Sequence, residues 1–159
     1  PRSAGSAGVD GRWMEPEGPV VKSKYLAYLK SIPLLANLRD DELDVVGQAA
    51  TELSLPEGEV LMREGTLAHE MFVVLEGTLE VTRGGEHLAD IGAGAFAGEM
   101  ALLIQARRDA TVTTATPARV LHIDGRSFSN LLDDAPHLAV SMLPIVAARL
   151  MANSDHHAH

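Results

Sequence analysis

Short segments rich in Val, Leu, Ile and Thr fill the middle of the chain, from residue 51 to residue 124. Each segment ends at glycine or proline, and closely spaced segments with such turn residues are typical of antiparallel strands. Gly77 and the pair Gly84-Gly85 lie between segments. We expect hairpin turns there, because glycine accepts positive φ angles freely. The pattern predicts about eight strands in a sandwich or barrel.

Helical periodicity brackets this region on both sides. Before it lie two apolar stripes with helical spacing, Tyr25, Leu26 and Leu29, and then Leu43, Val46 and Ala50. After it lie a third stripe, Phe128, Leu131 and Leu132, and a last helical segment that contains Pro144. We expect Asn37 or Asp40 to cap the second helix and Pro144 to kink the last one. The predicted fold class is α+β, an antiparallel β jelly roll or barrel of about eight strands flanked by N-terminal and C-terminal helices.

Composition excludes several classes of protein. The formal net charge is −9 and no basic run is present, so we expect neither nucleic acid nor an anionic membrane surface as a partner. The chain has no cysteine, which excludes disulfides and thiolate metal sites and is consistent with a cytoplasmic location. No apolar run approaches the ~20 residues of a membrane span.

The two ends of the chain differ from its centre. The first residues are rich in Gly, Ser and Ala and have no hydrophobic period, and the last ones, "DHHAH", are polar. We therefore expect residues 1–20 to be a disordered leader or an expression remnant, residues 21–152 to form one domain, and residues 153–159 to be a flexible tail.

The stretch "FAGEMALLIQARRDATV", residues 96–112, carries the candidate chemistry. Gly98 precedes Glu99, a turn of helix formers follows, and two arginines then precede a β-branched strand. Free N–H groups at the start of such a turn favour an anion. A carboxylate can accept from hydroxyl groups, and a guanidinium group binds phosphate oxygens. The segment therefore suits a sugar phosphate, although a surface ion pair between Glu99 and Arg108 explains the spacing equally well.

Several motifs in order resemble the cyclic nucleotide-binding domain family, which includes domains of cyclic-nucleotide-regulated channels, kinases and bacterial regulators of the catabolite activator type. The stretch of residues 96–112 is similar to the family's phosphate-binding cassette. "LPEGEVLMREG" and "MFVVLEGTLEV" resemble its upstream strands, and "IPLLANLRDDEL" resembles its N-terminal helical entry. The resemblance covers residues 25–150 and implies a jelly roll with flanking helices.

The resemblance also implies contacts to a ligand. By position, Glu99 binds the ribose 2′-hydroxyl and Arg108 binds the cyclic phosphate. The backbone of Gly98, Met100, Ala101 and Ala110 supplies further hydrogen bonds, and Thr111 offers a hydroxyl. The final helix acts as a lid, with Leu143, Ile145, Val146 and Leu150 as candidates for contact with the base. Phe128 corresponds to a hinge aromatic, although all five of these residues also fit an ordinary core.

Three positions depart from the family pattern. Arg107 stands where proline is usual, and Pro144 lies inside the lid helix. Asp109 follows the cassette arginine, where it could repel a phosphate or accept hydrogen bonds from a guanine amino group. Asp109 therefore bears directly on the choice between cAMP and cGMP.

We expect a non-catalytic receptor module for a cyclic nucleotide, with cAMP favoured over cGMP, no other cofactor, and C-terminal helices that shift on binding. Nothing after the last helix resembles a DNA-binding or catalytic module, so we expect the output to pass through an effector protein, a homodimer, or domains that lie outside this sequence. The alternative is a degenerate domain of the same fold that binds no nucleotide and serves as a protein-interaction module. A metal-dependent barrel enzyme is disfavoured, because His69, His87 and His122 are solitary in the sequence and no catalytic triad is indicated.

Overall fold

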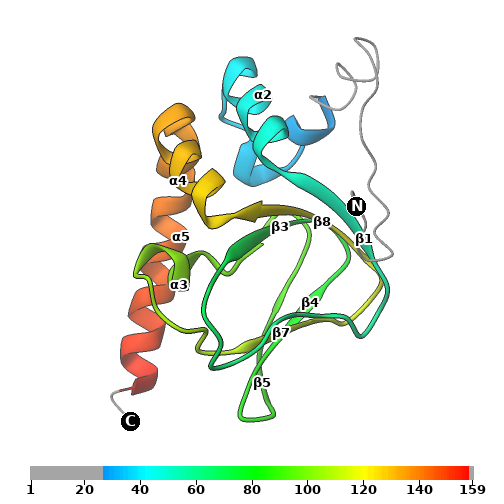
Figure 1. Cartoon of the computed structure of the whole chain (residues 1–159), viewed down its shortest axis with the longest axis vertical. Coiled ribbons are helices and arrows are strands. Elements are labelled where there is room, and N and C mark those ends of the chain that lie inside the picture. Colours follow the sequence, from blue (N-terminus) through cyan, green and yellow to red (C-terminus); the bar gives the residue numbers. More distant parts are fainter. Residues whose placement is uncertain (1–26, 158–159) are drawn as a thin grey trace.

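The computed structural model describes residues 27–157 (Figure 1). The expected leader, residues 1–20, and the first two members of the first apolar stripe, Tyr25 and Leu26, lie outside the described residues. Helical residues 27–30 and the short 3₁₀ helix η1 (Pro33–Leu35) open the described part of the chain.

Within residues 27–157, eight strands form two antiparallel four-stranded sheets, which confirms the predicted fold class. One sheet has the order β1-β8-β3-β6 and the other has the order β2-β7-β4-β5. The strands are β1 (Thr51–Leu55), β2 (Val60–Met62), β3 (Glu70–Glu76), β4 (Leu79–Arg83), β5 (Glu86–Ile91), β6 (Phe96–Ala97), β7 (Thr111–Thr114) and β8 (Ala118–Asp124). Figure 1 shows the two sheets facing one another, the arrangement of a jelly roll.

Strand β3 lies between the two parts of the hydrophobic core. Successive side chains on a strand point to opposite faces. Met71 and Val73 accordingly join a cluster with the helices, while Phe72 and Val74 join a cluster between the two sheets. Burial on both faces explains why the sequence of this strand is continuously apolar rather than alternating.

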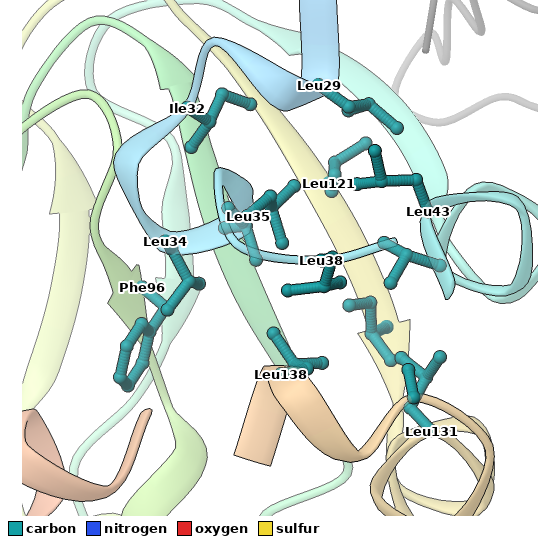
Figure 2. Close-up of a cluster of buried hydrophobic side chains, with 14 of the residues drawn as sticks. Leu29, Ile32, Leu34, Leu35, Leu38, Leu43, Phe96, Leu121, Leu131 and Leu138 are labelled. Atoms are coloured by element: carbon teal, nitrogen blue, oxygen red, sulfur yellow. The ribbon is translucent and has the colours of Figure 1, made fainter. Parts of the chain in front are cut away.

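The helices cover the outer face of the β1-β8-β3-β6 sheet, as Figure 1 shows for α2 and α4. They are α2 (Asp40–Ala49), α4 (Gly125–Asp134) and the N-terminal part of α5 (Pro136–His157), with α3 (Glu99–Leu103) between β6 and β7. Leucines from η1, α4 and α5 belong to the same buried cluster as Leu121 of β8, as Figure 2 shows. Within this cluster the start of α5 packs with η1 and α4.

The start of α2 differs from the prediction. The helix begins at Asp40, and the side chain that caps its first turn is Glu42, whose Oε1 accepts a hydrogen bond from the Arg39 N–H at 2.9 Å. Neither predicted cap residue, Asn37 nor Asp40, has this role, because Glu42 reaches back to the free backbone donor from the third helical position.

Gly77 joins β3 to β4 as expected, with a φ of 93°. A Cβ atom there would lie 2.5 Å from the Pro117 carbonyl oxygen, so the hairpin needs glycine for space as well as for φ. Gly84 and Gly85, in the β4–β5 hairpin, also have positive φ angles, 60° and 83°.

Helix α5 continues through Pro144 to His157. A helix that is already nucleated extends at little cost, which allows it to include polar residues. Within residues 27–157 no single helix is long and apolar enough to cross a membrane; the pair α4 and α5, bent by 111°, meets that criterion of length and composition only when taken together.

Candidate functional site

The predicted cassette forms a compact excursion between β6 and β7. Gly98 follows β6 with a φ of 94°, α3 gives the expected short helical turn, and Gln105 leaves it with a φ of 53°. A Cβ atom on Gly98 would lie 2.6 Å from Cε of Met62 and 2.9 Å from Nη1 of Arg108. Glycine is therefore required here by the packing of the Arg108 guanidinium group as well as by the backbone angle.

Glu99 is buried, with 1% of its surface exposed. Its two carboxylate oxygens each lie 2.8 Å from Nη1 of Arg149, which reaches down from α5. The Nη2 atom of Arg149 donates to the Phe96 carbonyl oxygen at 2.8 Å, and its guanidinium carbon lies 4.7 Å from the centroid of the Phe96 ring. Glu99 is thus a desolvated carboxylate with a cationic partner from a distant helix.

Arg108 is also buried, with 5% of its surface exposed. Its Nη1 donates to the Gly98 carbonyl oxygen at 2.7 Å, and its Nη2 donates to the Glu70 carbonyl oxygen. The Glu70 carboxylate lies 3.7 Å from Nη2. Burial lowers the pKa of Arg108, and the nearby carboxylates of Glu70 and Glu99 offset part of that effect. The group nevertheless stays charged at neutral pH, as arginine does throughout proteins.

The two residues do not pair with each other. Among the described residues, the ion pairs of Glu99 and Arg108 are with Arg149 and Glu70, and both side chains are buried rather than on the surface. The explanation of their spacing as a mutual surface ion pair is therefore wrong. Backbone carbonyl groups and the arginine of α5 hold the two charges apart.

Both residues border one pocket of about 410 Å³. Its walls come from the cassette, from β4 and β5, and from α5, whose Arg149 and Ala152 face it. Seven of the eight residues predicted for the ligand site line it, namely Gly98, Glu99, Met100, Ala101, Arg108, Asp109 and Ala110. The eighth, Thr111, is not among the lining residues, and its hydroxyl accepts a hydrogen bond from the Glu64 N–H at 3.0 Å.

Asp109 has its own partner. The Arg83 side chain on β4 donates to the Asp109 backbone oxygen at 2.8 Å and to its Oδ2 at 3.1 Å. Arg107, the other unusual residue of the cassette, is exposed and donates to the Gly65 carbonyl oxygen. The negative charge of Asp109 therefore meets a positive charge at the wall of the pocket.

The apolar lid residues lie elsewhere. Leu143, Ile145 and Leu150 are exposed, Val146 packs partly against the helical core, and none of these residues lines the pocket. Phe128 is buried in the helical core cluster. Sequence reasoning missed Arg149, Arg83 and the β5 wall formed by Leu88, Ala89 and Ile91. A lone arginine within the apolar segment "IVAARLM" was the available signal for Arg149.

Two of the three histidines that could suggest a metal site, His87 and His122, lie in different surroundings. His87 contacts Glu80 at 2.9 Å, and the ring of His122 packs against Phe72 at 5.4 Å. In the part of the chain that the structure describes, no three His, Asp or Glu side chains are grouped so that they could hold a metal ion.

Comparisons with known proteins agree with this geometry. The family model described as the cyclic nucleotide-binding domain matches residues 52–135, from β1 through α4. A cyclic nucleotide-gated potassium channel of Rhizobium etli is 33% identical over 109 residues, which are 69% of this chain and 30% of the channel. A cAMP-dependent protein kinase regulatory subunit of Yarrowia lipolytica is 33% identical over 113 residues, 70% of this chain and 30% of that protein.

A solved structure shows the same fold. The catabolite activator protein of Thermus thermophilus superposes with a TM-score of 0.68 at 25% identity, covering 78% of this chain and 61% of that one. Of the potassium channel and the kinase regulatory subunit, this chain spans less than a third of the length. Because the family model includes both sheets and the whole segment between β6 and β7, the chain belongs to the cyclic nucleotide-binding domain family.

Proposed function

We propose that this chain is a non-catalytic receptor module that binds cAMP in preference to cGMP. The observation that carries the proposal is that Glu99 and Arg108, both buried and both charged, border the same pocket without bonding to each other. A ligand with a hydroxyl group at one end and a negative charge at the other fits such a pair. The likeness to a cAMP-dependent kinase regulatory subunit supports the same ligand class.

The two side chains have free bonding capacity for these roles. Arg108 has five N–H donors, and its hydrogen bonds to the carbonyl oxygens of Gly98 and Glu70 use two of them. We assign the others to the cyclic phosphate and the Glu99 carboxylate to the ribose 2′-hydroxyl. Gly98, Met100, Ala101 and Ala110 line the same pocket, and we assign further hydrogen bonds to the ligand to their backbone groups.

The preference for cAMP rests on Asp109. A guanine amino group would need an acceptor, and Asp109 is the acidic cassette residue that we considered for this role. Its carboxylate already accepts a hydrogen bond from Arg83. It is therefore less available to accept one from a guanine amino group. The same ion pair reduces the repulsion between Asp109 and the phosphate.

We further propose that binding shifts α5 and that the signal passes to an effector protein or to a second copy of the chain in the cytoplasm. Helix α5 supplies Arg149 and Ala152 to the pocket wall, so a ligand that contacts this wall has different affinities for docked and undocked helix. The exposed apolar side chains of Val140, Leu143 and Met151 offer a surface for such a partner.

Thermal unfolding with millimolar cAMP, cGMP or 5′-AMP tests the proposal. A ligand at ~1,000 times its Kd stabilises the folded state by about 4 kcal/mol, so we expect a large rise of the melting temperature with cAMP and a smaller one with cGMP. The non-cyclic 5′-AMP controls for unspecific nucleotide binding.

The opposite result has a definite meaning. If neither cyclic nucleotide changes the melting temperature, the chain is a degenerate module in which Arg149 and the carbonyl partners of Arg108 satisfy the two charges for structural reasons. If cGMP stabilises the protein more than cAMP does, the argument from Asp109 is wrong.

A further inference from the structure

A second pocket, of about 520 Å³, adjoins the pocket that holds the predicted cassette residues. Its walls are β2, the loop of residues 63–69 that leads into β3, and the cassette at Arg107. The two pockets share Met62 and Arg108 and have no other lining residue in common. This second pocket, which we call the loop pocket, is within the usual size range of small-molecule sites.

The loop pocket is cationic, although the chain as a whole has a formal net charge of −9. Three arginines and a histidine line it, against one carboxylate, that of Glu70. Glu70 lies 3.7 Å from Nη2 of Arg108 and balances the charge of that arginine. The other three cationic residues, Arg63, His69 and Arg107, are exposed, and none of them pairs with a carboxylate within residues 27–157.

The carboxylates that neighbour these arginines in the sequence are directed elsewhere. Oε1 of Glu64 accepts a hydrogen bond from the Gly84 N–H at 3.0 Å. Oδ2 of Asp109 lies 3.1 Å from Nη2 of Arg83. Both carboxylates therefore contact the β4–β5 hairpin, which leaves the two exposed arginines of the loop pocket available to an anionic ligand.

Backbone hydrogen bonds hold together the two segments that carry these arginines. The Gly65 N–H donates to the Arg108 carbonyl oxygen, and the Arg108 N–H donates to the Thr66 carbonyl oxygen, both at 2.8 Å. Nη1 of Arg107 donates to the Gly65 carbonyl oxygen at 3.0 Å, which uses one of the five N–H donors of the guanidinium group. Groups that are fixed before a ligand arrives lose less conformational entropy when they bind it.

We propose that the loop pocket is a second ligand site, which binds a small organic anion with two or more phosphate groups. Guanidinium groups form paired hydrogen bonds to phosphate oxygens, and two arginines on separate segments match more than one phosphate group. Val60, Leu61 and Leu67 add an apolar wall for the organic part of the ligand. The proposal does not depend on the function proposed above, because the residues that it assigns to the ligand line only the loop pocket.

Titration calorimetry with inorganic pyrophosphate and with ADP, in magnesium-free buffer that contains saturating cAMP, tests the anion contacts. Arg63→Gln and Arg107→Gln each remove one charge at an exposed position. Each should weaken the binding of both probes about 10-fold, the lower end of the range for a hydrogen bond to a charged group. Arg126→Gln is the matched control and should bind both probes as the unaltered protein does, because Arg126 is an exposed arginine on α4 that lines neither pocket.

The same titrations test the apolar wall. ADP should bind more tightly than pyrophosphate, because its adenosine part gains contact with this wall. Leu67→Ser should reduce the advantage of ADP without changing the affinity for pyrophosphate, and Leu67 is exposed, so the fold does not depend on its burial. Equal affinities of ADP and pyrophosphate in the unaltered protein would overturn the assignment of an organic ligand.

Three results would overturn the site as a whole. They are the absence of binding by either probe, equal binding by the unaltered protein and both arginine variants, and displacement of both probes by cAMP, which would place them in the first pocket. If the unaltered protein binds no cyclic nucleotide, the function proposed above fails. The titrations without cAMP then still decide the loop pocket, because Arg63→Gln and Arg107→Gln act only there.

Discussion

At the scale of single residues, Arg108 combines burial with unused donors, which makes it the most sensitive position for ligand binding. Its truncation in Arg108→Ala would leave the ligand phosphate without its charged partner. We expect a loss of about 2–4 kcal/mol in binding free energy for cAMP, measured by titration calorimetry. Arg107→Ala is the control, because Arg107 is adjacent but exposed, and its loss should change affinity by about 1 kcal/mol or less. Equal affinities of Arg108→Ala and the unaltered protein would refute the assignment.

Gly98 is constrained by both its backbone and its neighbours. In Gly98→Ala the new Cβ would lie closer to Met62 and Arg108 than the usual contact distance. The residue would also have to keep a φ of 94°, which alanine rarely adopts. Gly58→Ala is a matched control, since Gly58 has a φ of 87° and no heavy atom within 4 Å of the added Cβ. Both variants should lose about 1–2 kcal/mol of stability to the left-handed conformation, measured by urea unfolding. Only Gly98→Ala should also weaken cAMP binding, because it displaces the Arg108 guanidinium group; equal binding by the two variants would contradict this.

The candidate site was predictable from the sequence only where it is local. Glu99 and Arg108 belong to one continuous stretch with a recognisable order of residue types, and the structure places both at one pocket. Arg149 lies 50 residues from Glu99 along the chain. No spacing rule connects them, because their contact depends on how α5 crosses the cassette.

At the scale of elements, the glycine and proline residues between segments predicted the positions of the strands well. The orientation of α5, in contrast, could not be predicted from its sequence. Apolar residues occur on every side of this helix, so periodicity does not single out a buried face. In the structure Leu138 and Met142 face the core, and Leu143 and Leu150 face outward. We predicted apolar residues of this helix as contacts to the base. The α5 residues that line the pocket are instead Arg149 and Ala152.

Pro144 weakens this helix locally. It lies inside α5 and is exposed, so its replacement in Pro144→Ala removes no core contact and restores a backbone N–H that can donate within the helix. Proline in a helix interior costs up to about 3 kcal/mol relative to alanine. We expect Pro144→Ala to slow hydrogen exchange in the second half of α5 and to raise the melting temperature. A lower melting temperature would show that the proline shapes α5 in a way that stabilises the fold.

At the scale of the whole molecule, the sequence predicted helices at both ends of the barrel but not which sheet they cover. That choice depends on long-range packing: β3 and β8 are apolar on both faces, and each apolar face could have met either the other sheet or the helices. In the folded protein a polar contact joins the N-terminal helix α2 to the C-terminal helix α5. The Glu42 carboxylate in α2 accepts hydrogen bonds from the backbone N–H and the ring of His137, at the start of α5.

This contact makes stability depend on pH. Burial raises the pKa of Glu42, but hydrogen bonds from the Arg39 N–H and from His137 outweigh it and lower the pKa from 4.5 to about 2. The unfolded chain therefore takes up the proton first as pH falls. The stabilisation from Glu42 is fully present above about pH 4.5 and is lost progressively as pH falls toward 2.

Urea unfolding at pH 5 and at pH 3 checks this dependence. Glu42→Gln should be less stable than the unaltered protein at pH 5, and the difference should shrink at pH 3, because the unaltered protein loses the Glu42 contribution that the variant already lacks. Glu57→Gln is the control, since Glu57 is exposed near the β1–β2 turn and its replacement should give a small difference that is similar at both pH values. If Glu42→Gln loses stability as steeply as the unaltered protein between pH 5 and pH 3, another carboxylate governs the acid sensitivity and Glu42 acts only by its shape.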